Sequence, residues 1–200
     1  MPTFSNSPNR CKTISSNSAS QSGKTIYGSP CPDVIKGTRL DDDISGHQQR
    51  DHLRGRKGDD TLKSGSGRDT ILGGHGSDQL RGGSGNDVLR GGSGQDNLRG
   101  GKGHDNLRGG RGTDILKGRR GNDVLHGGHK ADYFYLSNGN DKIIDFQPNK
   151  GDKIISKTRY TLSISERNGS VLLQDLDEGL NTLVQGTTVN ALIAFQPELF

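Results

Sequence analysis

The sequence predicts an all-β fold in which short parallel strands stack along one axis, followed by a smaller β-rich cap at the C-terminus. Three observations carry this prediction. A nine-residue pattern repeats without a gap from residue 28 to residue 135, its eighth position is apolar in every copy, and glycine gathers at its first, second and fourth positions. A short fixed period of this kind is typical of a solenoid, whose coils bury a core only by stacking on one another.

The composition alone would indicate disorder. Glycine accounts for 32 of the 200 residues, only 26% of the residues are hydrophobic, and tryptophan is absent. A chain this polar rarely buries a conventional core. The regular period gives the high glycine content a different meaning, because one apolar side chain per nonad is enough once the copies are stacked into a narrow, continuous core.

Within each nonad, the glycines open backbone conformations that are closed to other residues, and so they favour a tight turn with exposed carbonyls. The last three residues extend, with the middle one pointing inward and its neighbours outward. The inward residues at position eight are Ile35, Ile44, Leu53, Leu62, Ile71, Leu80, Leu89, Leu98, Leu107, Leu116, Leu125 and Phe134.

The sixth position of every nonad is aspartate. These residues are Asp33, Asp42, Asp51, Asp60, Asp69, Asp78, Asp87, Asp96, Asp105, Asp114, Asp123 and Asp132. Stacked strands lie about 4.8 Å apart, so the coils bring these carboxylates close together. Two carboxylates at about 5 Å repel by roughly 3 kcal/mol at an effective dielectric constant of 20. A preference for turns would be met as well by Asn or Ser. The unbroken aspartate therefore indicates bound cations, and oxygen donors on flexible loops suit Ca²⁺.

These nonads, of the pattern Gly-Gly-x-Gly-x-Asp-x-apolar-x, resemble those of the RTX (haemolysin-type) calcium-binding proteins. The resemblance implies a right-handed parallel β-roll with two nonads per coil, and several Ca²⁺ ions held between successive turns on each edge. It places Asp60, Asp78, Asp96, Asp114 and Asp132 on one edge and Asp69, Asp87, Asp105 and Asp123 on the other. The further metal-binding positions that it implies are Gly74, Gly76, Gly83, Gly85, Gly92, Gly94, Gly101, Gly103, Gly110 and Gly112.

Some nonads depart from the pattern. The second-position glycine is replaced by Thr38, His47, Arg56 and Arg119, and the fourth-position glycine by Cys31, Leu40, Gln49 and Lys130. Residues 73–117, by contrast, match the full pattern in five consecutive copies. We therefore expect the first three nonads to be structural coils with weak or absent metal sites.

The flanking segments differ in character from the repeat. Residues 1–27 are rich in Ser and Asn and are expected to form a flexible leader, while residues 136–200 hold most of the aromatic residues and are expected to form the cap. The cap contains a hairpin signal, Asn168-Gly169, between two apolar stretches. Cys11 and Cys31 match no metal-binding motif, which leaves open either one disulfide or two separate thiols.

Position nine is basic in most nonads. With eighteen residues per coil, Lys63, Arg81, Arg99 and Lys117 would lie on one face of the roll, and Arg54, Arg90, Arg108 and His126 on the other, where Leu72 interrupts them. One interpretation is balance against the aspartates, and another is a face that binds a polyanion such as an extracellular polysaccharide. The Arg-Gly-Gly triplets suggest a third, a disordered RNA-binding segment, which the absence of aromatic residues from 28–132 disfavours.

The function expected from the sequence is calcium binding by a secreted, non-catalytic protein that folds when it binds Ca²⁺. No stretch is apolar enough to span a membrane, and the N-terminus lacks the features of a cleaved signal peptide. The resemblance implies an extracellular location and type I export through an uncleaved signal, which would lie within 136–200. The Ser, Asp and His residues follow the repeat instead of forming a separate catalytic constellation, so we expect no enzyme activity.

Overall fold

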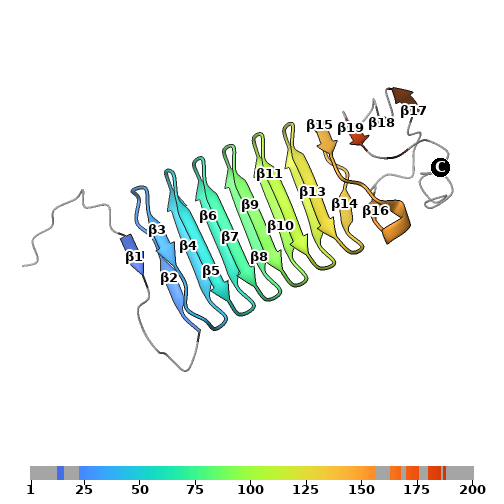
Figure 1. Cartoon of the computed structure of the whole chain (residues 1–200). Coiled ribbons are helices and arrows are strands. Elements are labelled where there is room, and N and C mark those ends of the chain that lie inside the picture. The colour runs from blue at the N-terminus through green and yellow to red at the C-terminus, as the bar shows by residue number, and fades with distance from the viewer. Residues whose placement is uncertain are drawn as a thin grey trace, which may run out of the picture.

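The computed structural model describes residues 13–15, 23–155, 163–167, 170–175, 180–185 and 187, and it is built from strands throughout (Figure 1). In chain order, the strands are β1 (Thr13–Ser15), β2 (Thr25–Tyr27), β3 (Val34–Lys36), β4 (Asp43–Gln48), β5 (His52–Lys57), β6 (Thr61–Ser66), β7 (Thr70–His75), β8 (Gln79–Ser84), β9 (Val88–Ser93), β10 (Asn97–Lys102), β11 (Asn106–Arg111), β12 (Ile115–Arg120), β13 (Val124–His129), β14 (Tyr133–Tyr135), β15 (Gly139–Ile143), β16 (Lys153–Ile155), β17 (Ser163–Arg167), β18 (Ser170–Asp175) and β19 (Leu180–Gln185). A 3-10 turn, η1 (Pro148–Lys150), precedes β16.

The strands alternate between two parallel sheets. Odd-numbered strands from β1 to β15 follow one another in the first sheet, and even-numbered strands from β2 to β16 form the second. We call them the odd sheet and the even sheet. Each residue pairs with the one eighteen positions later, as in Leu98↔Leu116, so one coil consists of two nonads. The predicted all-β parallel β-roll is confirmed, and the disordered RNA-binding alternative is wrong, because the Arg-Gly-Gly triplets lie in paired strands.

The core is the file of position-eight side chains between the two sheets. From Ile35 to Phe134 none of them is more than 2% exposed. The file also continues beyond the expected limits of the repeat, to Ile26 before it and to Ile143 and Ile154 after it. One apolar side chain per nonad thus suffices for a continuous core because each is covered by the coils above and below it.

The strands are longer than expected. Most have six residues and run through positions seven to nine and on through positions one to three, so that only positions four to six form the turn. Position-one glycines are buried, and a Cβ there would strike the aspartate carboxyl of the same nonad, as Gly91 would strike Asp96. Glycine at position one therefore leaves space for the buried carboxyl group, and its role is not to bend the chain.

The stacking extends past both ends of the segment that the pattern marked out. β2 pairs with β4 inside the stretch expected to be a flexible leader, and β1 pairs with β3. After Tyr135, β15 pairs with β13, and β16 pairs with β14 with two additional residues in the coil. The physical reason is that Ile26, Ile143 and Ile154 still supply an apolar residue to the core, although the glycines are lost.

The C-terminal strands close the odd sheet. β19 adds to β15 in parallel, and β18 and β17 continue antiparallel, with Val171, Leu173 and Val184 fully buried. These strands agree with the hairpin signal in the sequence, whose turn residues lie outside the described part of the chain. No helix among the described residues is long and apolar enough to cross a membrane.

The central layers of the core should carry the stability of the roll. We expect Leu98→Ala to lower the free energy of unfolding by about 2–5 kcal/mol, because it opens a cavity between two coils that cannot collapse independently. Leu40→Ala is the matched control, since Leu40 is 37% exposed and should change stability by no more than about 0.5 kcal/mol. Urea denaturation followed by circular dichroism measures both variants, and an equal effect of the two would contradict this view of the core.

Candidate metal centre

The turns bring the aspartates together into two columns, one along each edge of the roll. Each aspartate amide donates a hydrogen bond to the Oδ1 atom of the aspartate one coil later, at 2.8–3.0 Å. The first column contains Asp33, Asp51, Asp69, Asp87, Asp105, Asp123 and Asp141, and the second contains Asp42, Asp60, Asp78, Asp96, Asp114, Asp132 and Asp152. Their side chains point inward, and none of these residues is more than 4% exposed.

The hydrogen bonding of the second carboxylate oxygen, Oδ2, differs between the middle of the columns and their ends. In the middle it is buried and accepts no hydrogen bond, as for Asp51, Asp60, Asp69, Asp78, Asp87, Asp96, Asp105, Asp114 and Asp123. At the ends the protein supplies a partner. The Thr38 amide donates to Asp42 Oδ2 at 2.6 Å, the Ser137 hydroxyl to Asp141 Oδ2 at 2.6 Å, and the Gln147 amide to Asp152 Oδ2 at 2.8 Å. The structure thus caps the outer carboxylates and leaves nine inner ones uncapped.

A main-chain carbonyl oxygen of the next coil lies in the same region as the uncapped oxygen at several position-one glycines. Asp78 Oδ2 and the carbonyl oxygen of Gly91 in the next coil both lie within 3.0 Å of the point where a Cβ of Gly73 would stand. The same arrangement holds around Gly55, where the two acceptors are Asp60 Oδ2 and the Gly73 carbonyl. Two acceptors that face each other without a donor repel, and a cation between them turns this repulsion into attraction.

The glycines singled out from the sequence lie at positions two and four, and their carbonyls form two further files of oxygen atoms. The carbonyl of Gly74 faces the α-carbon of Gly92, and that of Gly76 faces the α-carbon of Gly94, so closely that a Cβ would collide with it. These glycines also have positive φ angles, for example +132° at Gly94. A side chain is thus excluded both by conformation and by the approach of the neighbouring coil.

Five residues with side chains adopt positive φ in the same turns. They are His47, Gln49, Arg56, Arg119 and Lys130, all at position two or four of a nonad. The turn therefore keeps its shape in the third nonad, where Asp51 Oδ2 is also uncapped. In the second nonad, Thr38 instead caps its aspartate. Ser29 and Thr38 thus donate to the carboxylate in the first two nonads, whereas the third has no such donor, and the expected weakness of these sites stays a prediction.

A second ladder on the outside of the turns is not evident from the sequence pattern. At position five, a side-chain acceptor receives the amide of the residue one coil later, as from Ser77 to Asp59 at 2.7 Å and from His104 to Asn86 at 2.8 Å. The His104 ring continues the ladder by accepting the Asn122 amide at Nδ1. The signal in the sequence is the recurrence of Asn and Asp at position five. These bonds hold the turns in register from the solvent side.

Burial changes the acid–base chemistry of the columns. It raises the carboxyl pKa from 3.8 to about 7 for Asp60, Asp96, Asp105, Asp132 and Asp141, and to about 6 for Asp51, Asp78, Asp87 and Asp114. The hydrogen bond from the neighbouring amide opposes this rise, and the next carboxylates in the column add to it, as Asp114 and Asp78 do for Asp96. The ionised column is thus unfavourable by itself and needs protons or cations.

Side chains alone do not make a metal site here. Within the described part of the chain, no three His, Cys, Asp or Glu side chains gather closely enough to hold an ion. A bound cation would therefore require main-chain carbonyls beside the aspartates. Such a mixed set of hard oxygen donors fits Ca²⁺ and does not fit zinc or other metals that prefer nitrogen and sulfur.

A stack of short parallel strands with an inward aspartate in every turn defines a repeat protein of the β-roll class. The chain belongs to the family of the RTX calcium-binding nonapeptide repeat, whose four-copy profile matches residues 36–71, 72–107 and 108–143, more than half of the chain. No curated protein sequence matches it significantly. Among solved structures it is similar to the extracellular lipase LipA from Serratia marcescens, at 16% identity and a TM-score of 0.32, over 80% of this chain and 38% of the lipase.

The pKa shifts predict how the roll responds to pH when no metal is present. The folded state holds protons more tightly than the unfolded chain, whose aspartates titrate near 3.8, so stability falls as the pH rises from about 4 to about 7. We expect the metal-depleted chain to be more stable at pH 5 than at pH 8 by at least about 2 kcal/mol. Circular dichroism and urea denaturation in metal-free buffers measure the difference. Equal or greater β-structure at pH 8 would contradict it.

Proposed function

We propose that Ca²⁺ ions bind along both aspartate columns and that their binding drives the folding of the roll. The observation that carries the proposal is the run of nine buried Oδ2 atoms without a hydrogen-bond donor. A buried carboxylate that lacks a partner costs several kcal/mol unless it is neutralised. Nine in succession would leave the ionised roll unstable, and calcium removes this cost.

The residues proposed to hold the ions are the inner aspartates and the glycine carbonyls beside them. Asp60, Asp69, Asp123 and Asp132 flank the five unbroken nonads, in which Asp78, Asp87, Asp96, Asp105 and Asp114 alternate between the two columns. Asp51 joins this set because its Oδ2 is uncapped. Asp33, Asp42, Asp141 and Asp152 are proposed to act without an ion, since each has a donor from the protein.

The proposal further assigns the protein to the outside of the cell and gives it a binding role instead of a catalytic one. Extracellular calcium modules bind at about 10⁻⁴ to 10⁻³ M, far above cytosolic calcium, so the chain would remain unfolded during export and fold afterwards. Membership of the RTX family supports this location. Among the described residues, the buried titratable groups belong to the columns and are used in stacking, which supports a scaffold.

A calcium titration of two matched variants tests the proposal. Asp96→Asn keeps an acceptor for the Asp78 amide but removes the charge of an uncapped carboxylate, so we expect the calcium midpoint for folding to rise severalfold. Asp59→Asn removes a carboxylate charge from an exposed residue outside the columns and keeps the acceptor of the Ser77 amide, so the midpoint should change by less than about twofold. Circular dichroism at increasing calcium gives both midpoints, with magnesium as the control cation. Equal shifts, or a wild-type chain fully β-structured without calcium at neutral pH, would refute the proposal.

A further inference from the structure

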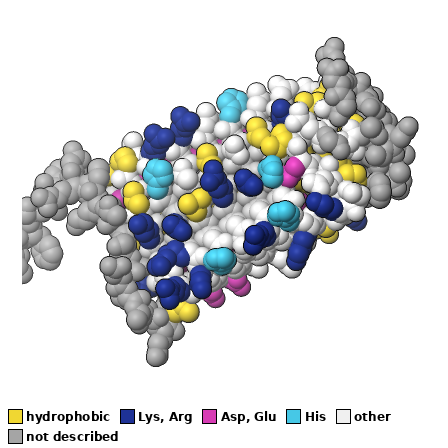
Figure 2. All heavy atoms as spheres, viewed as in Figure 1, with side chains coloured by type: hydrophobic (Ala, Val, Ile, Leu, Met, Phe, Trp, Pro, Cys, Tyr) yellow, Lys and Arg dark blue, Asp and Glu magenta, His cyan; other side chains and the backbone are white. Residues whose placement is uncertain are grey.

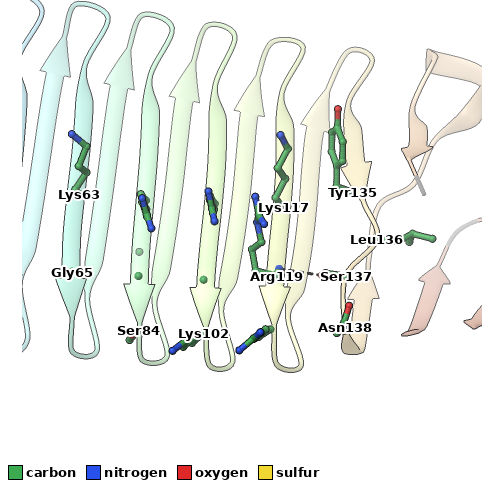
Figure 3. Close-up of a pocket in the computed structure, with 16 residues that line it drawn as sticks. Lys63, Gly65, Ser84, Lys102, Lys117, Arg119, Tyr135, Leu136, Ser137 and Asn138 are labelled. Atoms are coloured by element: carbon green, nitrogen blue, oxygen red, sulfur yellow. Dashed lines mark hydrogen bonds between the residues drawn. The ribbon is translucent and has the colours of Figure 1, made fainter. Parts of the chain in front are cut away.

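The outer surface of the even sheet carries a row of cations that the calcium chemistry does not use. Lys63, Arg81, Arg99 and Lys117 pair with one another across β6, β8, β10 and β12, and we call them the basic row. Tyr135 on β14 continues the same register. Figure 3 shows Lys63 and Lys117 aligned across the strands with Tyr135 at the end of the row. The row forms one side of a groove of about 810 Å³.

Glycines and further cations shape the rest of this groove. Gly65, Gly83 and Gly101 lie along its floor, where the lack of side chains leaves a trough beside the basic row. Arg119 is in register with these glycines at the end of their row, and on the opposite side Ser84 is followed by Lys102 and Arg120. Positive charge therefore borders one side of the groove along its length and the other side at its β10–β12 end, and no Asp or Glu is among the lining residues. On the face of the roll seen in Figure 2, the Lys and Arg side chains also predominate over Asp and Glu.

The positive charge is only slightly compensated within the described part of the chain. Lys63 lies 3.7 Å from Asp43 in an exposed ion pair, and Lys117 lies over the ring of Tyr135, 4.3 Å from its centre. Burial lowers the pKa of Arg99, and the positive charges of Arg119 and Arg81 lower it further. The aspartates of the columns point into the interior, so their carboxylates do not face this surface.

The odd sheet shows which kind of group such a groove accepts. Its corresponding row contains Arg90, Arg108 and His126, and it ends at Asp145. The Asp145 carboxylate accepts hydrogen bonds from the amides of Gly127 and Gly128 at 2.9 and 2.8 Å and lies 3.1 Å from His126 Nδ1. A carboxylate of the chain itself therefore docks at the end of one row. In the even sheet, the Arg119 amide instead donates a hydrogen bond to a neutral acceptor, the hydroxyl oxygen of Ser137, at 3.1 Å.

We propose that the groove of the even sheet binds a linear polysaccharide that carries one carboxylate per sugar and lies across the strands, parallel to the axis of the roll. The cations repeat at the strand spacing, about 4.8 Å. Neighbouring sugars of an extended acidic polysaccharide face opposite sides of the chain, so the carboxylates on one side recur every second sugar and meet every second coil. A single-stranded nucleic acid would need several aromatic platforms, and Tyr135 is the only aromatic residue among the described residues that line the groove. The inference rests on the proposed function, because calcium must fold the roll before the row exists.

Paired charge removal on the two sheets tests the inference. Arg81→Gln/Arg99→Gln neutralises the centre of the basic row, and Arg90→Gln/Arg108→Gln makes the same change on the odd sheet. The probe is a short oligogalacturonate, titrated calorimetrically into the full chain at saturating calcium, with dextran as the neutral control. We expect the even-sheet variant to bind about tenfold more weakly and the odd-sheet variant to lose no more than about twofold. Raising the salt concentration should weaken binding of the wild type.

The possible results separate this inference from the proposed function. Absence of binding by the wild type, equal losses in both variants, or equal binding of dextran would overturn the inference. Tighter binding of oligothymidylate would replace the polysaccharide with a nucleic acid. Circular dichroism in calcium checks each variant, and Lys102→Gln/Arg120→Gln on the opposite side of the groove provides a second pair if the first fails to fold. A chain that folds without calcium would refute the proposed function and leave the binding measurement intact.

Discussion

One constraint governs the roll: every turn must place a carboxyl group inside the molecule, against the backbone amide of the aspartate one coil away. The amide of each aspartate donates to Oδ1 of the next, so the column is also the hydrogen-bonded spine of the edge. The same geometry leaves Oδ2 buried without a donor through the middle of both columns. The aspartate carboxylate that sets the register of the coils through Oδ1 is thus also the buried charge that opposes folding. A polar chain with one apolar residue per nonad has little hydrophobic stabilisation with which to offset that charge.

The glycine pattern follows from this constraint. Position one is small because the carboxyl occupies the space of a Cβ, and positions two and four favour glycine because the neighbouring carbonyls approach the α-carbon at positive φ, although five residues with side chains also adopt this conformation there. Where the second position is Ser or Thr, the backbone turns differently and a hydroxyl or amide reaches the carboxylate, as at Thr38 and Ser137. These residues lie near the two ends of the columns. At both ends of the columns, the uncapped carboxylates are thus followed by carboxylates that accept a hydrogen bond from the protein.

The sequence predicted the regular part of the fold because identical nonads impose identical local geometry. The position-eight core follows from the period, and the two aspartate edges were implied by the resemblance to the RTX repeats. The glycine pattern did not predict where the roll begins and ends, because stacking there depends on an apolar residue at the right spacing, as at Ile26, Ile143 and Ile154. The first coil stacks although Lys24 takes the place of the position-six aspartate. The last coil stacks although it contains two additional residues near η1. The capped carboxylates were missed for a similar reason: a Ser or Thr four residues before an aspartate forms this bond only once the turn is closed.

The negative charge of the aspartates inside the roll and the positive charge on its outer surface influence each other. Interior aspartates reduce the positive potential above the sheets as long as they are ionised and unpaired, because little polar solvent lies between them and the surface. In the proposed calcium-bound state, each Ca²⁺ on the columns would add two positive charges and offset part of the negative potential of the aspartates. The proposed anion on the basic row would then bind more tightly, and by linkage it would tighten calcium binding to the same extent. The Lys and Arg residues at position nine thus act in the same electrostatic system as the aspartates at position six, three residues earlier in the turn that leads into each strand.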